Sequence, residues 1–129
     1  MKILFVSSEC APYSKSGGLA DVAGSLPPAL KKAGDEICVV TPYYKCVKEK
    51  FQNDLSFVKS MTITLGSRQL YCGLFRTEYR GVPIWFVDNE EFFERDRLYG
   101  YADDALRFAF FCRAVIDLLP DYGFKPDII

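Results

Sequence analysis

One segment near the N-terminus combines residue types that can bind an anion. It runs from Glu9 to Leu30 and reads ECAPYSKSGGLADVAGSLPPAL. Gly17 and Gly18 lack a Cβ atom, so their backbone N–H groups can approach a ligand closely. Lys15 adds a mobile positive charge that suits a phosphate. A helical pattern begins at the glycines, and a helix N-terminus attracts the same anion. The segment therefore predicts a phosphate-binding loop.

The loop matches neither of the two generic phosphate-binding motifs. Walker A requires GxxxxGK[ST], whereas here the lysine precedes the glycines, and the dinucleotide fingerprint GxGxxG is absent. Taken alone, the glycine pair also fits a tight strand-to-helix turn that needs positive φ. Taken alone, Lys15 also fits a solvated surface side chain.

Composition excludes several other kinds of chemistry. The chain has 129 residues, a net charge of −1, no histidine and five cysteines without a CxxC pair. A Ser-His-Asp triad and a histidine metal ligand are therefore impossible, and a disulfide framework or zinc site is not expected. Free cysteines are typical of the reducing cytoplasm. The near-neutral charge predicts no nucleic-acid partner, and no apolar run approaches the roughly 20 residues that span a membrane. No cofactor is expected.

A βαβ unit is predicted to position the loop. Apolar runs at 2–6 and 37–41 indicate buried parallel strands, and apolar spacing over 19–33 indicates a helix that Gly34 ends. The loop then lies at the carboxyl end of the first strand, where open α/β sheets bind ligands. Pro27 and Pro28 fall inside the helix. They predict a kink, or a break after which Ser25 caps a second segment.

The middle of the chain predicts an antiparallel meander. Strand patterns at 60–65, 70–77 and 82–87 are separated by short turns. Pro83 indicates that the third strand begins there or lies at an edge of the sheet. We expect this meander to be an insertion in an otherwise parallel α/β pattern.

The last third predicts a short helix and loop over 89–101, a helix over 103–119 and the start of a buried strand at 126–129. Two i,i+4 ion pairs are expected in the long helix, Asp103–Arg107 and Arg113–Asp117. Its expected apolar face consists of Phe108, Phe111, Cys112, Val115 and Leu119. The whole pattern predicts an α/β fold: a Rossmann-like three-layer domain with a parallel sheet and an antiparallel β-meander insertion. Because the final strand is only begun, we expect a fragment of a longer protein.

The loop closely resembles the N-terminal signature of bacterial glycogen synthases and plant starch synthases. In that family, Lys-x-Gly-Gly-Leu follows a strand and a Ser-Glu-x-x-Pro segment. Here Ser8, Glu9 and Pro12 precede the matching stretch 15–19. The matching continues through 20–27, Leu98-Tyr99-Gly100 and 103–114, in the expected order.

The resemblance implies a retaining glycosyltransferase of the two-domain GT-B type. The family transfers glucose from ADP-glucose to the non-reducing 4-OH of an α-1,4-glucan such as glycogen. Residues 1–129 would form a truncated N-terminal, acceptor-side domain. The nucleotide-binding C-terminal domain and a histidine-containing loop would be absent, so the isolated chain is expected to be inactive.

The resemblance also implies roles for six residues. Lys15 would contact the phosphates or glucose of ADP-glucose, and Gly17 and Gly18 would donate backbone N–H groups to the same ligand. Three further residues would line the sugar cleft, namely Glu9, Asp21 and Tyr99, with Asp21 on the acceptor side. No catalytic residue is assigned within the chain.

Simpler structural roles stay open for the cleft residues. Glu9 and Asp21 also fit carboxylates that accept bonds from N–H groups of the loop and helix start. Tyr99 also fits a loop-packing aromatic residue, and Arg107 fits an ion pair within its helix. Trp85, Phe92 and Phe93 are predicted to lie in the core rather than to form a sugar platform.

Two alternative functions also stay open: a GT-B glycosyltransferase with a different nucleotide-sugar donor, and a free-standing α/β module that binds a phosphorylated ligand. In addition, Phe110, Ile128 and Ile129 are expected to expose apolar surface, so the fragment is expected to self-associate.

Overall fold

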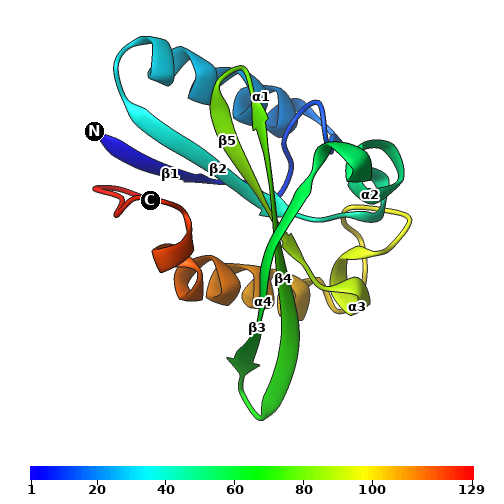
Figure 1. The fold of residues 1–129 in the computed structure, drawn as a ribbon. Helices are drawn as coiled ribbons and strands as arrows, with labels where there is room; N and C mark the ends of the chain where they lie inside the picture. Colours follow the sequence, from blue (N-terminus) through cyan, green and yellow to red (C-terminus); the bar gives the residue numbers. More distant parts are fainter.

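A mixed sheet in the order β1-β2-β5-β4-β3 forms the centre of the computed structural model, which describes residues 1–129 (Figure 1). The first three strands of that order are parallel to one another, and the last two run antiparallel to their neighbours. The strands are β1 (Lys2–Val6), β2 (Glu36–Pro42), β3 (Ser56–Leu65), β4 (Arg68–Tyr79) and β5 (Val82–Asp88).

Helices cover both faces of the sheet and complete the three predicted layers. Figure 1 shows α1 on one side of the sheet and α4 on the other. Two single turns of 3-10 helix follow α2 and α4, at Gln52–Asp54 and Leu119–Asp121. The α-helices are α1 (Gly18–Lys32), α2 (Lys45–Phe51), α3 (Glu90–Phe93) and α4 (Asp104–Asp117). The predicted Rossmann-like α/β architecture is confirmed, although α2 was not predicted.

The antiparallel meander is confirmed, but it is not separate from the parallel sheet. β5 is its third strand, and it also pairs in parallel with β2, from Val39↔Ile84 to Pro42↔Val87. The residues of β5 are apolar in an almost unbroken run and are mostly buried. Such a strand fits a position covered on both faces. Pro83 therefore does not mark a sheet edge. It is the second residue of the central strand β5, and it precedes Ile84, the first residue of β5 that pairs with β2.

The predicted break in α1 is wrong, because the helix runs without interruption through Pro27 and Pro28. Proline at position 27 cannot donate to the carbonyl of Ala23, four residues earlier. That carbonyl instead lies 3.6 Å from the Cys10 thiol, which donates to it. Ser25 caps no second segment; its hydroxyl donates to the Asp21 carbonyl at 2.6 Å.

Helix α4 is confirmed, but its buried face is rotated from the predicted one. Phe110 is fully buried and Cys112 is exposed, the reverse of the expectation for both. The cause is the short helix α3, which packs aromatic rings against α4. The ring of Phe110 lies 5.3 Å from that of Phe92 and 6.2 Å from that of Phe93. Phe110 therefore contributes nothing to an exposed apolar surface. The burial of Trp85, Phe92 and Phe93 confirms their core assignment.

The two predicted ion pairs of this helix have different outcomes. Arg113–Asp117 is present at 3.1 Å. Arg107 pairs instead with Asp104 at 2.8 Å, while Asp103 pairs with Arg95 at 2.6 Å. Asp103 precedes the first helical turn and is turned toward the preceding loop, so the i,i+4 geometry does not apply to it.

The C-terminal residues begin a parallel pairing on the free side of β1. Ile128 forms a parallel bridge with Ile3, and the Leu4 N–H donates to the Ile128 carbonyl at 3.0 Å. The parallel pairing predicted near Ile128 is therefore present as a single bridge beside β1.

Candidate functional site

The loop between β1 and α1 lies at the carboxyl ends of the parallel strands, and it ends in the glycine pair. Neither glycine has a positive φ. A Cβ atom added to Gly17 or Gly18 would meet no other atom within 4 Å. The tight-turn explanation of the glycines is therefore wrong, because neither backbone strain nor crowding within this chain requires them. Open space lies over both residues, at the N-terminus of α1.

Glu9 holds the backbone of this loop from the inside. Its side chain is only 2% exposed. The carboxylate accepts hydrogen bonds from the N–H groups of Ser16, Gly17 and Ala20, each at 3.2 Å, and from the Ser16 hydroxyl at 2.6 Å. Burial by itself raises the pKa of Glu9, but the bonds from Ser16, Tyr99 and the loop backbone outweigh it and leave the pKa below its ordinary value. Glu9 is therefore ionised and engaged, which confirms its structural interpretation.

Tyr99 reaches this carboxylate from the segment before α4. Its hydroxyl donates to Glu9 Oε2 at 2.7 Å and lies 2.7 Å from the Ser8 hydroxyl. Burial raises the pKa of Tyr99 to about 12, so the hydroxyl stays protonated as a donor. Tyr44 completes the network by donating to the Ser8 carbonyl at 2.7 Å.

Lys15 and Asp21 form a separate pair on the outside of the loop. The ammonium group lies 2.8 Å from both carboxylate oxygens. The two side chains are 54% and 58% exposed, so water screens the pair. The Lys15 ammonium group is thus already paired with the Asp21 carboxylate. An anionic ligand must compete with that carboxylate to bind Lys15.

The structure brings the predicted residues together in two groups. Glu9, Tyr99 and Gly17 share one hydrogen-bond network, and Lys15 and Asp21 pair beside it, with Gly18 opening the helix. Sequence reasoning gave no bonding role to Ser16 or Tyr44. Ser16 is the unspecified residue of Lys-x-Gly-Gly, and Tyr44 follows a strand with no motif around it, so only the fold reveals them.

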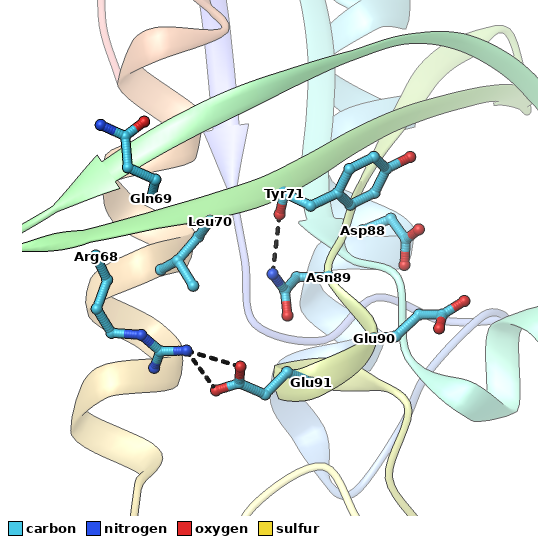
Figure 2. Close-up of a pocket in the computed structure, with 8 residues that line it drawn as sticks. All are labelled: Arg68, Gln69, Leu70, Tyr71, Asp88, Asn89, Glu90 and Glu91. Carbon is cyan, nitrogen blue, oxygen red and sulfur yellow. Dashed lines mark hydrogen bonds and ion pairs between the residues drawn. The ribbon is translucent and has the colours of Figure 1, made fainter.

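The largest groove lies elsewhere, between the tip of the β3–β4 hairpin and α3 (Figure 2). It has a volume of about 570 Å³ and contains none of the predicted site residues. Some of its polar groups bond to one another. Arg68 pairs with Glu91 at 2.8 Å, and Asn89 donates to the Tyr71 carbonyl at 2.9 Å while accepting from the Phe92 N–H. The Asp88 carboxylate has no hydrogen-bond or ion-pair partner, and burial raises its pKa to about 6.

No three acidic or cysteine side chains lie close enough together to hold a metal ion. None of the helices has the length and apolar character that a membrane crossing requires.

Comparison with known proteins identifies the family. Residues 2–129 match the family model described as the starch synthase catalytic domain. This chain belongs to that family. Over all 129 residues it is 50% identical to a glycogen synthase of Clostridium kluyveri and 46% identical to one of Geobacillus stearothermophilus. It spans 27% of the length of each of these proteins.

A solved starch synthase has the same fold over this region. The catalytic domain of starch synthase IV from Arabidopsis thaliana, bound to ADP and acarbose, superposes with a TM-score of 0.86 at 30% identity. The match covers 98% of this chain and 27% of that one. The chain therefore has the fold of the N-terminal domain of a GT-B glycosyltransferase, and it matches about a quarter of the length of the glycogen and starch synthases to which it is similar.

Proposed function

We propose that this chain is the N-terminal, acceptor-side part of a longer, cytoplasmic glycogen synthase. That enzyme transfers glucose from ADP-glucose to the non-reducing 4-OH of an α-1,4-glucan, with retention at the anomeric carbon. Its nucleotide-binding half lies outside these residues. The family match and the length of the relatives support this proposal.

One observation carries the assignment of the donor site. Gly17 and Gly18 leave open space at the N-terminus of α1, beside Lys15. Nothing in the fold of this chain requires glycine at either position, because an added Cβ atom would meet no other group. The Gly17 N–H is bonded to Glu9, so the Gly18 N–H and the Lys15 ammonium group are the donors that suit the oxygens of a diphosphate. During transfer the bond between glucose and diphosphate breaks, and negative charge grows on the leaving group. Lys15 then stabilises the transition state more than the ground state.

The remaining site residues take distinct parts in this proposal. Asp21 occupies Lys15 before the donor binds and faces the acceptor side of the cleft. Tyr99 and Glu9 lie behind the loop at the edge of the sugar cleft.

The purified 129-residue chain should not elongate glucan, because half of the cleft is missing. The test measures incorporation of labelled glucose from ADP-glucose into glycogen by this chain and by the longer enzyme that contains it. Incorporation by the chain alone would contradict the two-part site. Absence of incorporation by the longer enzyme would contradict the activity itself.

The substitution Lys15→Ala in the longer enzyme should lower kcat/KM for ADP-glucose by about 10²–10³-fold, the usual loss for one group that stabilises developing charge. The melting temperature should hardly change, because Lys15 is exposed and its ion pair with Asp21 is screened. Steady-state kinetics at saturating glucan, beside a thermal melt, measure both. Lys15→Arg should rescue only in part, since a guanidinium is larger and planar.

Two further variants make the Lys15 result specific. Lys32→Ala removes an exposed lysine at the far end of the same helix and should leave the kinetics unchanged. The double variant Lys15→Ala with Asp21→Asn tests whether the carboxylate left behind repels the donor. Kinetics of Lys15→Ala within about twofold of wild type would make Lys15 an ordinary surface residue.

A further inference from the structure

A fully buried arginine on α4 lies behind the loop network. The Arg107 side chain has no exposed surface. Its guanidinium donates to the carbonyls of Phe92 and Leu98, at 2.6 and 3.0 Å, and to the Asp104 carboxylate at 2.8 Å. A buried charge is costly unless its contacts are well formed, and here Nε and Nη1 are bonded while Nη2 has no hydrogen-bond partner. This arginine is therefore a fixed point of the structure.

Arg107 and its ion-pair partner fix both ends of the segment that carries Tyr99. Arg107 bonds the Leu98 carbonyl just before Tyr99. The Asp104 carboxylate accepts from the N–H groups of Gly100 and Tyr101, just after it, at 2.8 and 3.1 Å. The ring of Tyr99 also packs on Phe108, with centroids 5.8 Å apart. The position of the Tyr99 hydroxyl is thus set from α4.

From Tyr99, the contacts continue to the backbone of the glycine loop. The Tyr99 hydroxyl donates to Glu9 at 2.7 Å, and Glu9 accepts the N–H groups of Gly17 and Ala20. The continuous series is Arg107, the 98–101 segment, Tyr99, Glu9 and the loop. The Tyr99 hydroxyl stays protonated and can donate, and the Glu9 carboxylate stays ionised and can accept.

We propose that Tyr99 and Arg107 are positioning residues for the glycine loop: together they hold Glu9, and through its bonds to the Gly17 and Ala20 N–H groups they hold the loop backbone in the conformation that leaves the space over Gly17 and Gly18 open to a ligand. The identity of that ligand rests on the proposed function. The positioning role does not, because it concerns contacts within this chain.

Amide hydrogen exchange of the 129-residue chain, followed by NMR, tests the positioning role directly. Tyr99→Phe removes only the hydroxyl and keeps the ring against Phe108. We expect the Gly17 and Ala20 amides to exchange about tenfold faster, as expected when a bond to a charged group is lost. The matched control is Tyr101→Phe, which also loses a hydroxyl that accepts a backbone bond, from Arg97, but does not touch Glu9.

A second variant tests the anchor on α4. Arg107→Lys keeps the charge, but its single ammonium nitrogen cannot occupy the positions of both Nε and Nη1, which bond different acceptors. It should lower the melting temperature and speed exchange at Gly17 and Ala20 about tenfold. If Arg107→Lys does not fold, Tyr99→Phe still decides the question. Exchange at Gly17 and Ala20 within twofold of wild type in Tyr99→Phe would overturn the proposal, as would equal acceleration by Tyr101→Phe.

A kinetic measurement separates this inference from the proposed function. In the longer enzyme, Tyr99→Phe should raise KM for ADP-glucose several-fold, and Tyr101→Phe should leave it unchanged. Faster amide exchange together with an unchanged KM for ADP-glucose would uphold the positioning role and overturn the assignment of the loop to the donor. Unchanged exchange would overturn the positioning role whatever the kinetics.

Discussion

At the scale of single residues, Asp88 makes stability depend on pH. It ends β5 beside the groove of Figure 2. Burial, with a smaller contribution from Glu90, raises its pKa to about 6, while Lys48 opposes the rise. A carboxyl group with a raised pKa favours the folded state in its protonated form. Its contribution is complete below the unfolded pKa near 4 and is lost as the pH rises through about 6.

Replacing Asp88 with Asn should therefore raise the melting temperature at pH 7.5 and leave it unchanged near pH 4. The expected gain in unfolding free energy at pH 7.5 is about 1 kcal/mol, after allowance for solvent around a partly exposed group. Paired thermal melts of the variant and wild type at the two pH values measure it. An equal difference at both values would show that the side-chain change, not ionisation, is responsible.

The sequence predicts which residues form the site, but not which of its two carboxylates is buried and which is exposed. The motif identifies Lys15 as a donor-binding residue and Glu9 and Asp21 as cleft residues, but it does not distinguish the two carboxylates from each other. In the structure Glu9 is buried and Asp21 is exposed. The difference arises because Tyr99, distant in sequence, approaches one carboxylate and not the other. Local spacing contains no information on that approach.

At the scale of elements, Gly24 determines how closely α1 packs on the loop before it. A Cβ atom at this position would lie 2.7 Å from the Ala11 carbonyl oxygen. In an ordinary helix interior, Gly→Ala stabilises by about 1 kcal/mol. Here Gly24→Ala should destabilise the protein by about 1–3 kcal/mol, since a backbone atom must move.

Chemical denaturation of Gly24→Ala beside Ser25→Ala measures this effect. Ser25 is exposed on the same helix, so its substitution should change the unfolding free energy by only about 0.5 kcal/mol. A stabilised Gly24→Ala protein would show that the loop yields to the added methyl group.

Most helices and strands were predictable from the sequence. The two wrong details, the break in α1 and the buried face of α4, have the same cause. Apolar runs and 3.6-residue spacing located the strands and both long helices. Within α1, Cys10 bonds the Ala23 carbonyl that Pro27 leaves free, and on α4 the buried face is the one that packs against α3. Each is a contact between elements, which the periodicity of one element cannot predict.

At the scale of the whole molecule, an apolar stripe remains exposed along α1. Leu19, Val22 and Leu26 follow helical spacing on one face and are each about half exposed, and Ile128 and Ile129 are exposed as well. Surfaces of this kind tend to associate. We expect concentration-dependent self-association of the chain, carried by this stripe and not by the buried Phe110.

Sedimentation velocity at increasing concentration measures this association. Val22→Lys places a charge in the stripe and should shift the distribution toward monomer. Ile116→Lys, at an exposed apolar residue on α4, should not. A wild-type chain that stays monomeric at high concentration would contradict the expectation.

The central position of β5 has a consequence for the entropy of folding. Its pairing with β4 closes only a two-residue turn, from Tyr79 to Val82. Its pairing with β2 joins Val39 to Ile84 across the whole of α2, β3 and β4. Loop-closure entropy grows with the length of chain enclosed. Pairing of β5 with β2, in the half of the sheet that carries the glycine loop, therefore costs more chain entropy than pairing of β5 with β4. We therefore expect partial unfolding to disorder the edge of the sheet that carries the glycine loop before it disorders the local hairpins.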